Sequence, residues 1–182
     1  ADSVNWWSAN GATVSLNSVL KTQGNTSVGV TAANGVLREI AFTPSHSIDI
    51  SDYAYLEFDV WFSNLDWVNA SENMMIELTS SGRCDVESYR FTKSSLLESC
   101  VEFANDVESG TGGNKWYHFR INLNAPHDKP NGGLNFEEFN YFRFYSIGAP
   151  AGTRSYEVYF DNMRFVKGEI ADKIIITDDA LI

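Results

Sequence analysis

The chain has 182 residues, a formal net charge of −11 and a hydrophobic share of 43%. This length suits one well-packed domain and is short for two. Nucleic acids and anionic membrane surfaces attract clustered Lys and Arg, so the negative charge argues against both as partners. The sequence contains no apolar run of about 18 residues that would span a bilayer. It begins with Ala-Asp-Ser-Val and has no initiator Met, so we expect a mature or excised piece of a longer protein.

Short segments of alternating polarity recur along the chain, with turn-forming residues between them. Strands are predicted, in chain order, at Thr13–Leu16, Thr26–Val30, Leu37–Phe42, Ala54–Phe62, Met74–Thr79, Ser88–Thr92, Lys115–Leu123, Tyr141–Ile147 and Glu157–Val166. Brief helical patterns occur only at Ser94–Glu102 and Asn135–Phe139. So many short strands, separated by Gly-, Asn- and Pro-containing turns, predict an all-β fold: a two-sheet antiparallel β-sandwich of the jelly-roll type.

The domain organisation expected from this pattern is simple. Residues 1–167 form the β-sandwich domain. The tail 168–182 contains one apolar, strand-like run and three aspartates. It either adds an edge strand or leads into a neighbouring module, and the sequence does not decide between these.

The segment Leu56–Phe62 places a tryptophan among acids. Alternate side chains of a strand point to opposite faces, so Glu57, Asp59 and Trp61 share the face opposite the core. Three further predicted strands divide in the same way, and their polar faces carry Trp116, His118, Arg120 and Asn122, then Tyr141, Arg143 and Tyr145, then Met75, Glu77 and Thr79.

Faces that mix aromatic and charged residues suit sugar binding. Aromatic planes stack on the C–H patches of sugar rings, while Arg, His and carboxylates exchange directional hydrogen bonds with hydroxyl groups. The alternative is an ordinary solvated face with incidental aromatics and cross-strand Arg–Glu pairs. Alternation alone leaves both interpretations open.

Six segments, in order, carry a family resemblance across roughly residues 2–166: WWSANGATVSL, KTQGNTSVGV, SIDISDYAYLEFDVWF, NKWYHFRINL, LNFEEFNYFRFYSIG and YEVYFDNMRFV. Together they resemble the β-sandwich carbohydrate-binding modules of bacterial cellulases, xylanases and amylases. The resemblance implies a secreted, non-catalytic module that holds its parent enzyme or scaffold on a polysaccharide, with a glucan or a xylan-like chain as ligand. Covalently linked neighbouring modules are then the expected protein partners, and we expect a monomer.

The resemblance also implies candidate binding residues, in two alternative modes. In the first, a cleft on one sheet is lined by Trp61, Glu57, Asp59, Glu77, His118, Arg120, Tyr141, Arg143 and Tyr145. In the second, the ligand binds at the loop edge, where Trp67, Asp66, Trp6 and Trp7 are the candidates. The motifs do not decide between cleft and edge.

Modules of this kind commonly hold a structural calcium ion. The matching positions are Asp2, the turn at Gly24 and Asn25, and Asp161. Carboxylate and carbonyl oxygens are the ligands that calcium prefers. The expected ion would fasten the start of the chain to the last strand and would not contact sugar.

Catalysis is a competing function for the same residues. Jelly-roll glucanases carry Glu-x-Asp-x-Glu on one strand, because retaining hydrolysis needs two carboxyl groups ~5–5.5 Å apart. Here Glu57 and Asp59 match the first two positions, but Trp61 stands where the second glutamate is required. A lyase that uses His118, Arg120 and Tyr145 is a further possibility, and so is a protein-adhesion module of the same fold.

The two cysteines, Cys84 and Cys100, allow two interpretations. In an exported protein they would form a disulfide worth ~3 kcal/mol in the chain-entropy model. Otherwise they are unrelated thiols. Their pattern, with only three histidines in the chain, does not fit a zinc site.

Overall fold

The computed structural model describes residues 4–10, 12–32, 39–65, 68–69, 73–147 and 156–168. Its strands are β1 (Trp7–Asn10), β2 (Thr13–Asn17), β3 (Ser27–Ala32), β4 (Glu39–Phe42), β5 (Tyr55–Phe62), β6 (Asn73–Thr79), β7 (Ser88–Thr92), β8 (Lys115–Asn122), β9 (Tyr141–Ile147) and β10 (Tyr156–Val166). The helices are α2 (Lys93–Ser99) and α3 (Val101–Ser109), with 3-10 turns η1 (Pro130–Gly132) and η2 (Phe136–Glu138).

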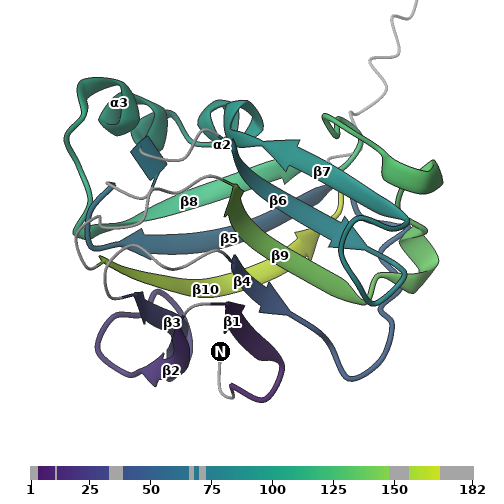
Figure 1. Ribbon diagram of the computed structural model, residues 1–182, viewed down its shortest axis with the longest axis horizontal. Coiled ribbons are helices and arrows are strands. Elements are labelled where there is room, and N and C mark those ends of the chain that lie inside the picture. Colours follow the sequence, from purple (N-terminus) through teal and green to yellow (C-terminus); the bar gives the residue numbers. More distant parts are fainter. Residues whose placement is uncertain are drawn as a thin grey trace, which may run out of the picture.

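The strands form two five-stranded sheets that pack face to face (Figure 1). One sheet, the β9 sheet, has the order β1-β4-β9-β6-β7, and the other, the β5 sheet, has the order β2-β3-β10-β5-β8. Every strand pair is antiparallel. The predicted all-β sandwich is therefore confirmed.

The core lies between the two sheets, and phenylalanine is its most frequent residue in the described part of the chain. Phe58 of β5 stacks on Phe119 of β8, with ring centroids 5.3 Å apart, and meets the edge of Phe142 from the opposite sheet at 6.1 Å. Helix α3 adds Phe103, which contacts Phe119 at 5.0 Å. Burial of these rings removes a large apolar area from water and holds the two sheets together.

The predicted strands agree closely with those observed, with two differences in the remaining elements. The short strand β1 was not predicted, although Trp7 and Ala9 alternate with Ser8 and Asn10 and pack against the core. The segment predicted as briefly helical forms two helices, α2 and α3, which together extend to Ser109. A left-handed Gly110, with φ 68°, then caps α3.

A bulge in β10 changes the direction of its side chains. The pairing with β5 shifts between Asp161 and Arg164, and Asn162 adopts a left-handed backbone with φ 52°. Before the bulge, Phe160 points into the core; after it, Met163 and Phe165 do. The extra residue thus keeps the second half of this strand apolar on its inner side.

Cys84 and Cys100 are both free thiols, the first in the β6–β7 hairpin loop and the second between α2 and α3. Burial raises the pKa of each thiol above its ordinary value. No helix among the described residues is long and apolar enough to span a membrane.

Candidate functional site

The residues predicted to line one cleft lie on two different faces. Glu77, Tyr141, Arg143 and Tyr145 belong to the β9 sheet, whereas Glu57, Asp59, Trp61, His118 and Arg120 belong to the β5 sheet. Both sheets turn their apolar sides to the common core, so the two polar faces lie on opposite sides of the molecule. The prediction of a single cleft lined by all nine residues is therefore wrong. A lyase site that combines Tyr145 with His118 and Arg120 is excluded for the same reason.

The outer face of the β9 sheet, here called the β9 face, consists of three cross-strand rows. The register gives the rows Glu39–Tyr145–Met75–Thr92, Ala41–Arg143–Glu77–Arg90 and Tyr141–Thr79–Ser88. The first row holds the carboxylate of Glu39, a phenol ring and a thioether. The second row holds the other three charged side chains, and each side chain of the third row carries a hydroxyl group.

Glu77 is at the centre of the charged row and is completely buried. Its Oε2 accepts a hydrogen bond from Nε of Arg143 at 2.6 Å, and its Oε1 lies 3.5 Å from Nε of Arg90. The backbone N–H of Asp85 donates to Oε1 at 2.8 Å. Glu77 is thus fully used inside the protein and exposes no surface to solvent.

The loop between β6 and β7 folds over this row and is visible in front of the β9 sheet in Figure 1. Asp85 accepts hydrogen bonds from Arg90 at 2.5 Å and from Arg143 at 2.9 Å, and its carbonyl oxygen accepts one from Asn131. Asp85 and Glu87 both have positive φ, 65° and 47°, which is strained for residues other than glycine. Such strain persists where surrounding contacts hold it, and it is frequent at ligand-binding loops.

The two tyrosines of β9 differ in exposure. The guanidinium of Arg143 lies 3.7 Å from the ring centroid of Tyr145, which is 6% exposed. Tyr141 is half-buried; burial and the nearby charge of Glu39 raise its pKa to about 12. Its phenol is therefore neutral at ordinary pH and remains a hydrogen-bond donor.

Among the described residues, three buried side-chain atoms lack a hydrogen-bond partner: Oγ1 of Thr79, Oγ of Ser88 and Nε of Arg90. All three belong to the outward-pointing residues of the β9 face. An unsatisfied buried polar atom costs roughly 1–3 kcal/mol, and so native structures rarely leave one without a partner or a bound water. The hydrogen-bonding capacity of this face exceeds what its own residues use.

The outer face of the β5 sheet, here called the β5 face, contains an aromatic row. Tyr159, Trp61 and Trp116 are register neighbours on three adjacent strands, and the ring of Tyr159 lies directly over Gly29, where a Cβ would overlap it. Trp61 meets Tyr159 at 5.6 Å and is only 6% exposed. Trp61 is thus a packed member of the row and presents little surface on which a sugar would stack.

The carboxylates of the β5 face are paired with neighbours on the same face. Glu57 accepts two hydrogen bonds from Arg164, at 2.7 and 2.9 Å, and lies 3.6 Å from Arg120. Asp59 lies 2.6 Å from Nδ1 of His118. No buried polar atom on the described part of this face is without a partner.

The Asp161 carboxylate of the expected calcium set already has partners within the protein. The Asp161 carboxylate accepts hydrogen bonds from the backbone N–H groups of Thr22, Gln23 and Asn162, at 2.7, 2.9 and 2.8 Å. These are donors, whereas calcium requires oxygen ligands. No group of three or more His, Cys, Asp or Glu residues suited to a metal occurs in the described part of the chain. Asp2 lies outside the described residues, and so the calcium ion stays a prediction.

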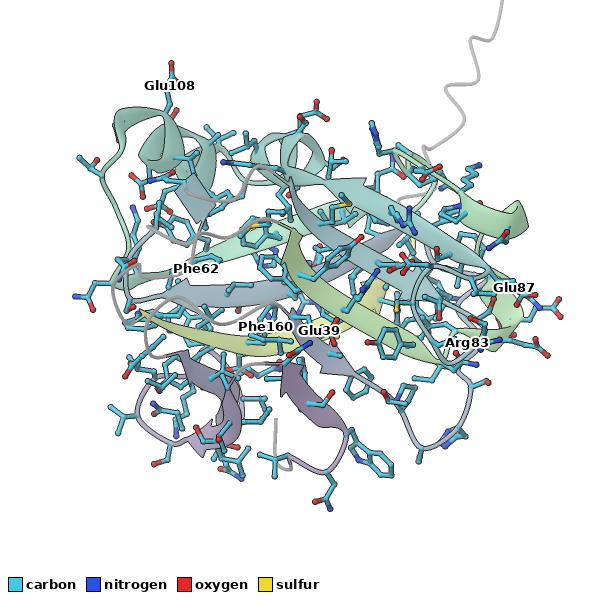
Figure 2. All side chains as sticks on the ribbon, in the orientation of Figure 1. Glu39, Phe62, Arg83, Glu87, Glu108 and Phe160 are labelled. Atoms are coloured by element: carbon cyan, nitrogen blue, oxygen red, sulfur yellow. The ribbon has the colours of Figure 1, made fainter. Side chains whose placement is uncertain are left out.

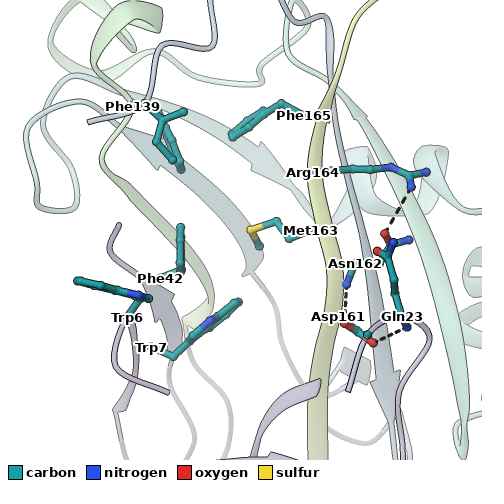
Figure 3. A pocket seen from close by; sticks show the side chains of 12 residues that line it. Trp6, Trp7, Gln23, Phe42, Phe139, Asp161, Asn162, Met163, Arg164 and Phe165 are labelled. Atoms are coloured by element: carbon teal, nitrogen blue, oxygen red, sulfur yellow. Dashed lines mark hydrogen bonds between the residues drawn. The ribbon is translucent and has the colours of Figure 1, made fainter. Parts of the chain in front are cut away.

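The structure describes only some of the residues expected to bind a ligand at the loop edge. Asp66 and Trp67 lie outside the described residues. Trp7 points inward and packs on Phe42 at 5.3 Å, whereas Trp6 is 45% exposed. Both tryptophans line a cavity at the side of the sandwich (Figure 3).

Three residues of the two faces, Arg90, Asp85 and Arg164, were not predicted from the sequence. Arg90 follows from the same alternation, applied to Ser88–Thr92. Arg164 was missed because the bulge shifts the alternation of β10, so that Arg164 points to the outer face although the alternation from the start of the strand would turn it inward. No local pattern signals Asp85, because a folded loop places it.

Comparisons with known proteins find likeness in fold but not in sequence. No protein-family model and no curated protein matches the chain. A family 11 carbohydrate-binding module from Clostridium thermocellum, solved with a β-1,3-1,4-mixed-linked tetrasaccharide, is 13% identical over 92% of each chain, with a TM-score of 0.54.

Two enzymes contain a similar unit. An exo-β-agarase is 11% identical, with a TM-score of 0.57, and a β-1,2-glucanase from Parabacteroides distasonis is 12% identical, with a TM-score of 0.51. Each match covers 90% of this chain but 23% of the enzyme. At such identities the likeness shows the fold alone. The resemblance to the β-sandwich of carbohydrate-binding modules is confirmed at that level.

Proposed function

We propose that the protein is a non-catalytic carbohydrate-binding module that attaches a parent enzyme or scaffold to a glucan or a xylan-like polysaccharide through the β9 face. The observation that carries the proposal is that a half-buried aromatic ring, partly exposed charged groups and a row of hydroxyl groups meet on this one face. Thr79 and Ser88 are completely buried, so their hydroxyl groups would interact with a sugar only through bound water.

The neighbouring side chains of the β9 face supply the rest of a sugar site. Tyr141 offers a half-buried aromatic ring and a neutral phenol beside the hydroxyl row. Arg90 and Asp85 are partly exposed, at 22% and 56% of their side chains, and provide a donor and an acceptor. Glu77 contacts no ligand but orients both arginines. The β5 face is less suited, because its charges are already paired with one another.

The proposal excludes catalysis because the two candidate carboxylates, Glu57 and Asp59, are already paired within the protein. A nucleophile needs an accessible carboxylate, and an acid needs a second one beside it. Glu57 is occupied by Arg164, and Asp59 by His118 and by the hydroxyl of Thr22 at 2.6 Å. Both are best explained as structural ion pairs of the β5 face.

The similar structures suggest where to begin with ligands and location. The Clostridium thermocellum module was solved with a mixed-linkage glucan fragment, and two polysaccharide-degrading enzymes carry a similar unit within a longer chain. We therefore infer an extracellular module joined to further modules, with mixed-linkage β-glucan as the first ligand to test.

Affinity electrophoresis against starch, mixed-linkage glucan, xylan, xyloglucan and mannan tests the function. We expect a glucan or xylan-like chain to retard the protein, without release of reducing sugar. Failure of every polysaccharide to retard it would contradict the proposal, and release of reducing sugar would favour a glycosidase.

Two variants, one on each outer face of the sandwich, test which face binds the polysaccharide. Tyr141→Ala removes an aromatic ring from the β9 face and should weaken binding about tenfold, which corresponds to ~1.4 kcal/mol. Trp116→Ala, on the β5 face, is the control and should leave affinity unchanged. The reverse result would move the site to the β5 face.

A further inference from the structure

A cavity of about 700 Å³ opens at the side of the sandwich, where apolar residues of both sheets and the polar residues Asp161, Asn162 and Arg164 of β10 border it. On one side it is bounded by Trp6, Trp7 and Phe42, at the β1 edge of the β9 sheet, and on the opposite side by Met163 and Phe165 of β10 (Figure 3). It lies where β3 pairs with β10 only as far as Phe160, so that among the described residues no strand pairs with the second half of β10 on that side.

The bulge in β10 makes the wall of this cavity apolar. Without the extra residue, strict alternation would turn Asn162 and Arg164 inward, in step with Phe160. The left-handed Asn162 shifts the phase, so that Met163 and Phe165 point inward instead. A strained backbone position is thus used to line a cavity that is open to solvent.

Three polar side chains of β10 that border the cavity are turned away from it and already have partners. In Figure 3, Asp161, Asn162 and Arg164 lie on the opposite side of β10 from Met163. In Figure 2, Phe160, the core residue that precedes them in β10, lies in the middle of the molecule, whereas Glu87 and Glu108 lie at its periphery. Asp161 accepts three backbone N–H groups, Arg164 pairs with Glu57, and the Asn162 amide donates to Asp59. The hydroxyl groups of a sugar would therefore find few partners here.

We propose that this cavity is a second binding site, which takes a small, uncharged aromatic molecule such as an indole or a phenol. Its volume is within the range of about 300–1,000 Å³ that is usual for ligand pockets. Five aromatic side chains line it, namely Trp6, Trp7, Phe42, Phe139 and Phe165, and edge-to-face contacts favour a further ring over an aliphatic chain. Met163 adds a thioether, which also contacts rings favourably.

Methyl NMR of the full chain with labelled methionines tests the site, using indole as the probe. The chain has three methionines: Met163 lines the cavity, Met74 is buried in the core, and Met75 is on the β9 face. We expect a saturable shift of the Met163 methyl signal, with a Kd on the order of 0.1–1 mM. Met74 and Met75 should not shift with indole, and glucose should leave the Met163 signal unchanged.

Two variants make the test specific. Trp6→Ala should weaken indole binding about tenfold, because it removes the exposed ring at the mouth of the cavity. Val19→Ala, at an 84% exposed position outside the cavity, is the control and should not change the Kd. A saturating polysaccharide should leave the indole Kd unchanged as well.

Three results would overturn the inference: no saturable shift of Met163 in the wild-type chain, a shift confined to Met75, or an unchanged Kd in a folded Trp6→Ala variant. The wild-type titration decides the matter even if the variant fails to fold. Because polysaccharide binding is measured separately, its failure would not affect this result.

Discussion

At the scale of single residues, outward direction from a strand did not mean access to a ligand. Glu77 and Trp61 both point away from the core, as alternation predicts, yet Glu77 is completely buried and Trp61 is 6% exposed. The first is covered by the β6–β7 loop and its two arginines, and the second is packed in a row of rings. Exposure depends on neighbours from distant parts of the chain.

Glu77→Ala should therefore lower stability and not only binding. The change leaves Arg143, which is 8% exposed, without its main partner, and such unpaired buried charges typically cost ~3–5 kcal/mol. The matched control is Glu39→Ala, whose carboxylate lies 3.6 Å from the same arginine but is 28% exposed; it should cost less than ~1 kcal/mol. Urea unfolding measures both, and equal costs would contradict the central role of Glu77.

At the scale of elements, the bulge in β10 decides more than any other irregularity. It sets the phase of the last strand, puts Arg164 beside Glu57 on the β5 face, and lines the cavity with Met163 and Phe165. The left-handed Asn162 is the backbone position that permits this.

Replacing Asn162 by Gly and by Ala isolates the backbone requirement, because both remove the side-chain amide. Gly adopts positive φ freely, whereas Ala is disfavoured there by ~1–2 kcal/mol. We expect Asn162→Gly to be more stable than Asn162→Ala by about that amount in urea unfolding. At the exposed Asn124, the Ala variant should be as stable as the Gly variant or more stable. A Gly variant that is the more stable one at both positions would argue against strain at the bulge.

At the scale of the whole molecule, one carboxylate joins distant segments. Asp161 on the last strand holds the turn of Thr22 and Gln23 over the β5 face through backbone hydrogen bonds. Burial raises its pKa, but the hydrogen bonds from Gln23, Thr22 and Asn162 outweigh burial, and the pKa lies below the ordinary value. An aspartate whose pKa is lowered by folding contributes stability above its unfolded pKa of about 3.9, and this stability is lost as the pH falls through the folded value.

The melting temperature should accordingly fall in acid, below about pH 4. Asp161→Asn should melt lower at pH 7, by roughly 2–4 °C for each kcal/mol lost, and should depend less on pH below about pH 4. Hydrogen bonds from Lys115 and Tyr117 also lower the pKa of Asp106, so the variant is needed to separate the two carboxylates. Equal acid dependence in both proteins would contradict the role given to Asp161.

The same melts, repeated with calcium and with a chelator, test the calcium prediction. An ion bound only by the folded protein must raise the melting temperature. An unchanged value would remove calcium and leave the backbone hydrogen bonds of Asp161 as the link between these segments within the described part of the chain.

The sequence by itself determined the fold class and the inner and outer side of most strands. The period of two is a local property, readable in Leu56–Phe62 or Tyr141–Ile147 without knowledge of partners. It correctly placed Phe58 and Phe142 in the core, and Arg143 and Glu77 outside it.

Only the tertiary structure decided which outer faces join into one surface. Strand order depends on hydrogen bonds between segments far apart in the chain, so β5 and β8 pair in one sheet while β6 and β9 pair in the opposite one. The loop of Asp85 and the bulge at Asn162 are likewise set by long-range contacts and a single backbone angle. Local periodicity carries no information on strand order, on this loop or on this bulge. For that reason the residues expected in one cleft lie on two opposite faces, and the cavity was not predicted.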